Sequence, residues 1–418
     1  MSAHESFGLS ALADLRVVEL GVWVAAPSAA ALLADWGAEV IKVEAPTGDP
    51  MRNVFGSIGI GGDRPNPAFA LDNRGKRSIV LNLAEPADRQ HLEELLSTAD
   101  VFISNLRPDA LDKLDLEPEA TMIRHPHLVY CSVSGYGLRG EDRNRPTYDI
   151  GAFWARSGLS SQMADGNGAP LNARGGVGDH ITGLAALAGI LAAILQQRET
   201  GVGRVVEVSL LRTGAYVLGW DLGLQMALGK VAGAEPRDRN QSPLMNPYRA
   251  SDGRWFFFTG LEAERHIGAV CRALGHAEWL GDERFSSAVA IRRNRIEIIA
   301  LLDDVIAERP LSEWSERFDS EGVWWAPVQS PAEVVTDPQL LGNDGFVEID
   351  GGAVRSVNGP VTFSGMVSNP AIGVPLLGDH TAEVLKELSD GERRRSHATT
   401  ENAQRSTSRV TEADSGRD

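Results

Sequence analysis

Apolar, β-branched runs alternate with helical patterns along the first half of the chain. Residues 15–20 (LRVVEL) and 39–44 (EVIKVE) predict strands, and residues 27–36 (PSAAALLADW) between them predict a helix with proline at an early position. Further strands are expected at residues 78–83, 101–104, 128–134 and 204–210, with a helix around residues 91–96. This alternation predicts an α/β fold with a parallel sheet covered by helices on both faces.

The pattern changes after a polar segment at residues 229–241 that contains Gly, Pro and Arg. A short strand is expected at residues 254–259, followed by mostly helical segments to about residue 326, and residues 374–385 end in a helix. We therefore expect the first part of a large domain in residues 1–228, a small α+β domain with linkers in 229–330, and a C-terminal return that completes the large domain in 331–388. The polar, aperiodic tail at residues 389–418 is expected to be disordered.

Composition narrows the classes of function. With 418 residues the chain is long enough for two domains, and its net charge of −17 gives no support to binding of nucleic acid. The two cysteines, Cys131 and Cys271, suit a reducing compartment, and neither they nor the histidines form a metal-binding pattern. We therefore expect no bound metal. The first residues lack the pattern of a secretory signal, so we expect a cytoplasmic protein. The longest apolar stretch, residues 183–195, is too short to cross a membrane and predicts a buried helix.

Several segments together resemble the class III CoA-transferases, also named after carnitine dehydratase and bile-acid-inducible protein F (the CaiB/BaiF type). They are VVELGVWVAAPSAAALLADWGAEVIKVEAP, NRGKRSIVLNL, ADVFISNLRPDAL, YCSVSGYG, RPTYDI, VGDHITGLAALAGILAAILQQRETGVGRVVEVSL and VPLLGDHTAEVL. The resemblance runs from about residue 15 to 385. It implies a Rossmann-like large domain, a smaller domain, and a homodimer whose chains interlock. It also implies that coenzyme A enters as an acyl-CoA, with a carboxylic acid as the acceptor.

The motif GGVGDHITG places Asp179 behind a glycine loop and immediately before the long predicted helix, at the position of the family's catalytic Asp. An ionised carboxylate there would form an acyl anhydride and then an aspartyl-CoA thioester. The helix N-terminus favours the ionised form, and the alternative role for Asp179 is a helix N-cap. Gly176 and Gly178 are candidate donors to the oxyanion, unless they only shape the turn. His180 is interpreted as a helix-start or packing residue more than as a catalytic partner.

The resemblance also implies a set of CoA contacts, in which two cations are candidates for binding the phosphates. The positions that match the family's contacts are Val24, Ala25, Leu81, Asn82, Leu83, Ala84, Asn105, Leu106, Arg107, Lys113, Pro146, Thr147, Tyr148 and Asp149. Arg107 and Lys113 are the two cations, and their alternative role is a solvated surface pair. Ala45 departs from the pattern, because some relatives carry Arg there.

Three alternatives to a CoA-transferase remain open. The racemases of the family carry His at the position of Tyr148, and tyrosine is a poor base at neutral pH, so transfer is favoured over racemisation. A CoA-binding protein without turnover is the second alternative, and the retained Asp179 argues against it. A dinucleotide-dependent enzyme is the third, and the turn GVWVAAP lacks the glycines of that class.

The substrate can be described only by size. The segment MNPYRASDGRWFFFTG lacks the run of glycines that closes over the intermediate in formyl-CoA transferases, which disfavours small acids such as oxalate. Six tryptophans either belong to the core or line a pocket for a bulky acyl group: Trp23, Trp154, Trp220, Trp255, Trp324 and Trp325. We expect a larger hydrophobic or steroid-type acid.

Overall fold

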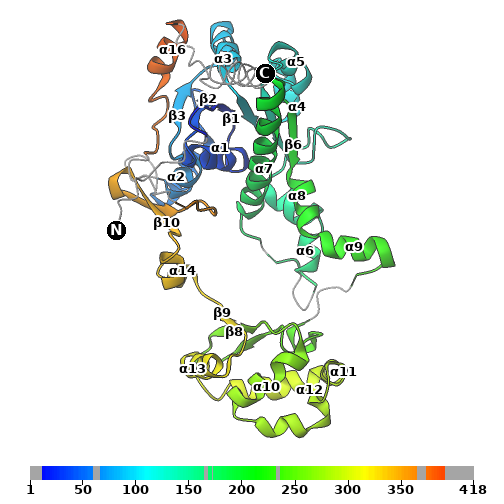
Figure 1. Cartoon of the computed structure of the whole chain (residues 1–418). Coiled ribbons are helices and arrows are strands. Elements are labelled where there is room, and N and C mark those ends of the chain that lie inside the picture. Colours follow the sequence, from blue (N-terminus) through cyan, green and yellow to red (C-terminus); the bar gives the residue numbers. More distant parts are fainter. Residues whose placement is uncertain are drawn as a thin grey trace, which may run out of the picture. The chain divides into compact units, whose positions relative to one another are not determined.

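The structure, a computed structural model, describes residues 12–59, 66–163, 168–171, 173–231, 236–364 and 373–390. The predicted disordered tail lies outside the described residues from position 391 onward. The chain divides into two compact units (Figure 1). The first comprises Met1–Ser160, Asn172–Gly223 and Asn343–Asp418, and the second comprises Ser161–Leu171 and Leu224–Gly342.

Six parallel strands form the main sheet of the first unit, in the order β3-β2-β1-β4-β5-β6. Their bounds are β1 (Arg16–Leu20), β2 (Glu39–Glu44), β3 (Arg77–Val80), β4 (Val101–Ser104), β5 (Val129–Ser134) and β6 (Val205–Ser209). The chain starts near the middle of the sheet and winds outward in both directions, which is the order of a doubly wound fold. The predicted parallel sheet is confirmed. A short antiparallel pair, β10 (Phe346–Ile349) and β11 (Val354–Val357), belongs to the same unit.

Helices cover both faces of this sheet. Those of the first unit are α1 (Ala25–Asp35), α2 (Pro67–Asn73), α3 (Pro86–Thr98), α4 (Pro108–Lys113), α5 (Pro118–Arg124), the π-helix Ile150–Arg156, α7 (Val177–Thr200), α8 (Leu210–Val217) and α16 (Thr381–Ser389). Two more, α6 (Leu159–Gln162) and α9 (Gly219–Leu228), cross the division between the units. Helix α7 is long and apolar enough to span a membrane, but one side of it is buried in the core, as expected for a core helix.

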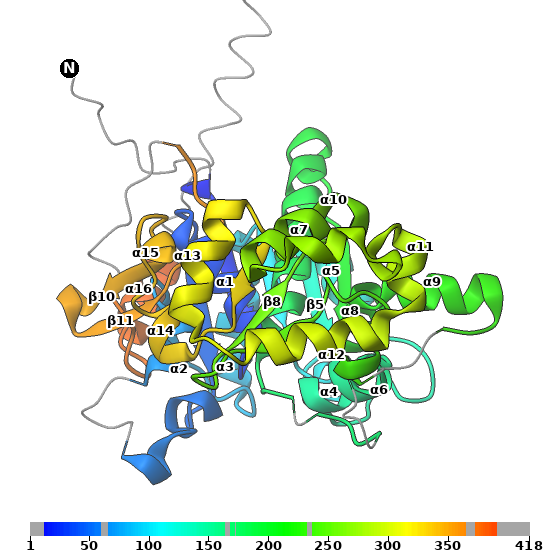
Figure 2. The same ribbon diagram turned by 90° about the horizontal axis from the view of Figure 1, so that it is seen from below.

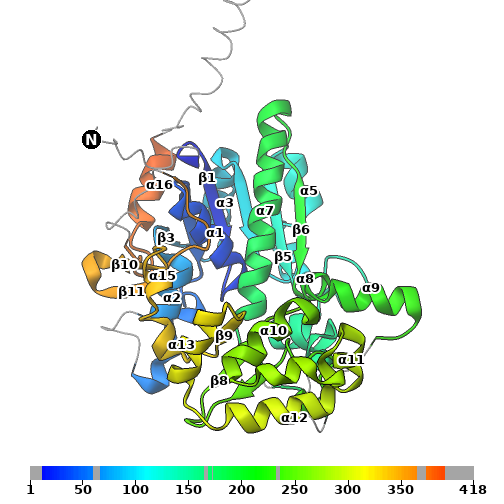
Figure 3. The same ribbon diagram turned by 60° about the horizontal axis from the view of Figure 1, so that its bottom comes forward.

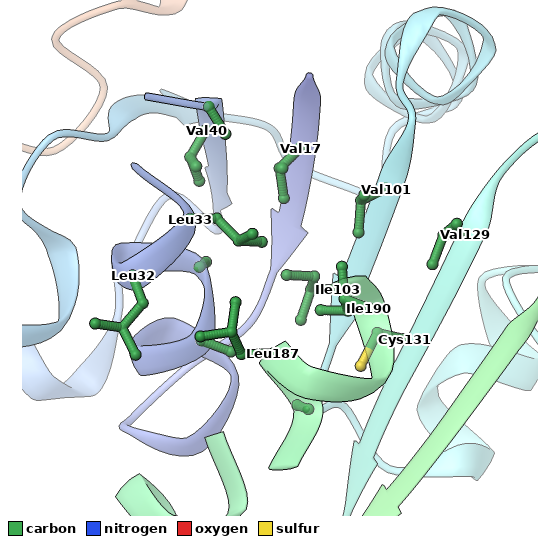
Figure 4. Close-up of a cluster of buried hydrophobic side chains, with 14 of the residues drawn as sticks. Val17, Leu32, Leu33, Val40, Val101, Ile103, Val129, Cys131, Leu187 and Ile190 are labelled. Carbon is green, nitrogen blue, oxygen red and sulfur yellow. The ribbon is translucent and has the colours of Figure 1, made fainter. Parts of the chain in front are cut away.

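The main core lies between the sheet and the pair of helices α1 and α7, which pack side by side (Figure 3). Val17 of β1 and Ile103 of β4 point into this layer, where they meet Leu33 of α1 and Leu187 of α7 (Figure 4). The alternate residues of the same strands point to the other face of the sheet, as strand geometry requires. There Val18, Phe102 and Tyr130 pack with residues of α3, α4 and α16.

The second unit is a small antiparallel sheet packed with helices (Figure 2). Its strands are β7 (Pro247–Arg249), β8 (Trp255–Phe258) and β9 (Trp325–Pro327), and its helices are α10 (Ala263–Leu274), α11 (Ala288–Arg293), α12 (Arg295–Ile306), α13 (Leu311–Glu321), α14 (Pro331–Val334) and α15 (Pro338–Leu341). Phe256 and Phe258 of β8 are buried against Trp314 and Phe318 of α13. This aromatic cluster is the centre of the unit's own core.

A buried ionic network lies among the first three strands of the main sheet. The Glu19 carboxylate accepts from Lys42 Nζ at 2.8 Å and from Lys76 Nζ at 2.5 Å, and all three side chains are 0% exposed. Burial alone would raise the pKa of Glu19, but the two lysines outweigh it and lower that pKa. Burial lowers the pKa of Lys76 to about 8, because the attraction of Glu19 offsets it only in part. The carboxylate of Glu19 therefore compensates two buried ammonium groups.

Replacing Glu19 should be strongly destabilising. We expect Glu19→Gln to lower the free energy of unfolding by about 3–5 kcal/mol, because it leaves Lys42 and Lys76 buried without their shared carboxylate. Urea denaturation followed by circular dichroism measures this loss. The control Glu119→Gln changes an exposed residue of α5 and should stay within about 0.5 kcal/mol of the wild type. A loss below about 1 kcal/mol in Glu19→Gln would contradict the assigned role.

Candidate active site

Asp179 lies in the first turn of α7, as the third residue of the helix. The helix begins at Val177, and Gly176 occupies the N-cap position with a φ of 87°, a left-handed conformation that glycine adopts without strain. The sequence-based placement of Asp179 immediately before the helix is therefore wrong, and so is its alternative role as N-cap. The reason is that the turn at Gly176 starts the helix earlier than the apolar pattern does.

Gly178 lets the carboxyl group of Asp149 approach the helix start that carries Asp179. A Cβ atom on Gly178 would lie 2.5 Å from Cγ of Phe153, so only glycine fits against the π-helix at this point. The close approach lets the Gly178 N–H donate to Oδ2 of Asp149 at 3.1 Å. Asp149 is buried and directly precedes the π-helix, a rare element that occurs often at functional sites. The Gly178 N–H is thus already engaged, although the sequence analysis proposed it as an oxyanion donor.

The electrostatic surroundings of Asp179 make it an unusually basic carboxylate. Burial raises its pKa to about 7, with a further contribution from the negative charge of Asp149. Asp72 also raises this pKa, whereas His180 lowers it. The helix N-terminus favours the ionised form of Asp179, but burial and the neighbouring carboxylates outweigh that effect and raise the pKa. At neutral pH the group is close to its midpoint, so the ionised and the protonated forms are both populated.

His180 has two ring contacts. Its Nδ1 lies 2.7 Å from the carbonyl oxygen of Gly176, and its Nε2 lies 3.1 Å from Oδ1 of Asp72 on α2. Sequence reasoning did not find Asp72, although Asn66 followed by Pro67 is a recognisable helix start that would have placed it on a helix.

Five of the positions that were expected to contact CoA line two neighbouring pockets of the first unit. A pocket of about 180 Å³ at the carboxyl ends of β1, β2 and β3 is lined by four of them, namely Leu81, Asn82, Leu83 and Leu106, together with Ala45. A second pocket of about 420 Å³ shares Leu83 with the first and is lined by Lys113 and by Arg89, which the sequence analysis did not single out. Arg89, Arg107 and Lys113 are exposed, and none of them forms an ion pair within the described ranges.

Other expected contacts have structural roles in this fold. The Asn105 side chain accepts from the Val22 N–H at 2.9 Å and donates to the Val22 carbonyl at 2.7 Å, so it holds the loop after β1. The side chains of Val24 and Ala25 are buried in the core.

The segment before the π-helix holds the remaining expected contacts. Pro146, Thr147 and Tyr148 precede Asp149, and the exposed ring of Tyr148 packs edge-on against Trp23 with ring centroids 5.6 Å apart. Ala84 is exposed, and its N–H donates to Oδ1 of Asn82. Among the described residues, no group of three or more His, Cys, Asp or Glu could hold a metal ion.

Comparison with known proteins identifies the family. Residues 12–381 match the sequence model of CoA-transferase family III. The chain belongs to CoA-transferase family III. The predicted family and its enzymatic nature are confirmed, and the substrates of this family III enzyme are an acyl-CoA and a carboxylic acid.

Two characterised relatives and one solved structure illustrate the similarity. The chain is 32% identical over 383 residues to an (R)-2-hydroxy-4-methylpentanoate CoA-transferase of Clostridioides difficile, covering 90% of this chain and 95% of that protein. It is 32% identical over 388 residues to a cinnamoyl-CoA:phenyllactate CoA-transferase of Clostridium sporogenes, covering 90% and 92%. A crystal structure of a CAIB/BAIF family protein from Brucella suis aligns with a TM-score of 0.79 and 29% identity over 90% of this chain and 98% of that one. Both characterised relatives are transferases, which favours transfer over racemisation for this family III chain.

Removal of the Asp179 charge should stabilise the fold. The raised pKa means that the folded state binds the proton more tightly than the unfolded state, whose Asp has the ordinary value of 3.8. The penalty is absent below about pH 4, grows as the pH rises, and is complete above about pH 7. We expect Asp179→Asn to be more stable than the wild type by about 1–3 kcal/mol at pH 8, allowing for partial exposure, and equally stable near pH 4.

Urea unfolding at pH 4, 6 and 8 measures the difference. The control Asp304→Asn, at an exposed position of α12, should show no comparable change with pH. A destabilised Asp179→Asn at pH 8 would show that the carboxylate is a structural group.

Proposed function

We propose that the protein exchanges CoA between two carboxylic acids through covalent intermediates on Asp179. The observation that carries the proposal is the half-buried Asp179 carboxyl at the start of α7, whose pKa burial and Asp149 raise to about 7. A carboxylate of this basicity is a stronger nucleophile than an ordinary exposed one, yet a large fraction is ionised at neutral pH.

The first half of the exchange loads CoA onto the enzyme. An Asp179 carboxylate oxygen attacks the thioester carbonyl carbon of the donor, the C–S bond breaks, and CoA leaves as the thiolate. The product is a mixed anhydride between Asp179 and the donor acid. The thiolate then attacks the Asp179 carbonyl carbon, the donor carboxylate leaves, and an aspartyl-CoA thioester remains.

The second half reverses these steps with the acceptor. The acceptor carboxylate attacks the aspartyl thioester and displaces CoA thiolate, which forms a second anhydride. The thiolate attacks the acceptor's carbonyl carbon and restores the Asp179 carboxylate. Each tetrahedral intermediate carries an oxyanion. The N–H groups of Val177 and Asp179 are available as donors, since neither has an acceptor within the described part of the chain.

The two pockets at the strand ends support a place for CoA. In this proposal the pantetheine arm follows the smaller pocket past Leu81 and Leu106. The phosphates lie towards the larger pocket, where Arg89 and Lys113 supply cations that have no ion-pair partner among the described residues.

We propose that the carboxylic acids between which CoA is exchanged have branched or aromatic side groups. The names of the two relatives include a branched hydroxy acid and two aromatic acids. Trp23 and Tyr148, which pack edge-on beside Asp149, offer an aromatic surface of the kind that such groups favour.

A panel of acyl-CoAs and free acids, analysed by mass spectrometry of products and of intact protein, tests the proposal. We expect new acyl-CoA species and an acyl or CoA adduct on Asp179 that hydroxylamine converts to a hydroxamate. Asp179→Ala should lose exchange by roughly 10³-fold or more while it still binds CoA, because the nucleophile is absent. Wild-type exchange in a folded Asp179→Ala would refute the covalent mechanism.

We also propose a homodimer, with chains that interlock as the resemblance implies. Helices α8 and α9 expose large apolar side chains, among them Tyr216, Trp220 and Met226, and Trp220 is 93% exposed. Large apolar side chains exposed in this number mark an interaction site, and a second copy of the chain is the partner that we propose.

Charge on this surface should weaken the dimer. We expect the wild type to be a dimer at micromolar concentration by light scattering, and Trp220→Glu to shift it towards monomer, because the charge would be desolvated at the interface. Ile123→Glu on α5 is the matched control, since Ile123 is 82% exposed. A dimeric Trp220→Glu would place the interface elsewhere.

A further inference from the structure

The Gly176 carbonyl oxygen receives two hydrogen bonds from His180. The backbone N–H of His180 donates at 2.9 Å and the ring Nδ1 at 2.7 Å, while Nε2 faces Oδ1 of Asp72 at 3.1 Å. A carbonyl and a carboxylate are both acceptors, so an imidazolium that donates from both nitrogens satisfies the two ring contacts. Burial lowers the pKa of His180, but the hydrogen bond and charge of Asp72 outweigh it and raise the pKa above its ordinary value.

Asp72 is held in place independently of α7. It is 2% exposed and belongs to α2, whose N-cap residue Asn66 accepts from two backbone N–H groups of the first turn. Directly after α2, the Arg74 guanidinium pairs with Asp35 of α1 at 2.6 Å. The His180 ring is therefore fixed against an element that is anchored on both sides.

These contacts determine the orientation of one peptide group at the start of α7. A peptide unit is planar and trans, so a fixed Gly176 carbonyl also fixes the Val177 N–H, which points the opposite way, out of the helix N-terminus. Gly176 has a φ of 87° and follows another glycine, so apart from the hydrogen bond from the His180 N–H little in the backbone opposes rotation of this peptide. The ring of His180 adds a second hydrogen bond to the same carbonyl, and with it a restraint that the glycines lack.

We infer that Asp72 and His180 are a positioning pair that locks the Gly176–Val177 peptide and presents the Val177 N–H to the oxyanion formed at Asp179. The inference rests on the proposed function, and neither residue exchanges atoms with the substrates. The charged groups that shift the pKa of Asp179 are Asp149 before the π-helix, Asp72 on α2 and His180 on α7. The pair therefore also places a cation next to the nucleophile.

Two substitutions of His180 separate a positioning role from a packing role. His180→Ala removes both ring contacts, whereas His180→Asn keeps an N–H donor near the position of Nδ1. With His180→Ala we expect the single-turnover rate of CoA release to fall by about 100-fold, the effect of losing one oxyanion donor. The KM for acyl-CoA should stay within about 3-fold of the wild type, and His180→Asn should recover the rate to within about 10-fold.

The pH profile provides a second readout. In His180→Ala the cation near Asp179 is lost while Asp72 and Asp149 remain, so the acidic midpoint of the rate should move up by about one pH unit. Asp72→Asn keeps a hydrogen-bonding partner for the ring whereas Asp72→Ala removes it, so we expect the plateau rate to fall further in Asp72→Ala than in Asp72→Asn. A His180→Ala variant with a lower Tm but an unshifted profile and a wild-type rate overturns the inference.

His276→Ala is the matched control. It removes another histidine–carboxylate contact, 2.8 Å from Glu278 in the second unit, and should change neither the rate nor the pH profile. An adduct on Asp179 in the wild type, together with an unchanged rate in a folded His180→Ala, rejects the positioning pair alone. If the wild type forms no adduct, the proposed function fails and the inference fails with it.

Discussion

The site depends on the close approach between the first turn of α7 and the π-helix. Gly178 has no side chain to separate them, so its N–H reaches the buried Asp149 and Phe153 covers the helix start. This contact brings the charge of Asp149 close enough to contribute to the raised pKa of Asp179. The arrangement costs stability at neutral pH, because a desolvated carboxylate is held near another one, and strain of this kind is characteristic of functional sites. A larger residue at position 178 would separate the two elements and so weaken the effect of Asp149 on the pKa of Asp179.

A chain of contacts through the loop after β1 connects the buried ions of the sheet to the segment that contains Asp149. Lys42 contacts both Glu19 and Asp49, and Asp49 accepts from the Trp23 N–H at 3.1 Å. Trp23 has a φ of 66°, an unfavourable conformation for a side chain of its size, which that hydrogen bond helps to maintain. Its ring then packs on Tyr148, the neighbour of Asp149. The buried ions thus help to hold Trp23 in place, and with it Tyr148, next in the chain to Asp149.

The parallel sheet could be predicted from the sequence, because its strands are nearly continuous apolar runs separated by helices. Its strand order could not, since the chain passes from β3 at one edge to β4 beside β1. The position of Asp179 also follows from its motif. Its environment does not, since Asp149 and Asp72 come from distant segments and only the folded chain sets their charges against it. Helix α2 has too few residues to show helical periodicity, and the π-helix has no sequence pattern of its own. The hydrogen bonds by which the Asn105 side chain holds the Val22 backbone likewise join segments far apart in the sequence.

The same charges bear on the order of the proposed exchange. The acceptor acid is an anion, and in the free enzyme it would approach Asp179 in the presence of Asp149 and Asp72, against one nearby cation on His180. In the aspartyl-CoA thioester, Asp179 is neutral and one negative charge is gone. Like charges in a partly desolvated site repel more strongly than in water, so the acceptor carboxylate should bind more tightly after Asp179 has been acylated than before. In the proposed exchange, the charges that make Asp179 basic therefore also favour release of the donor acid before the acceptor enters. The contact between Gly178 and Asp149, which helps to raise the pKa of Asp179, thus also bears on the order in which the two acids bind.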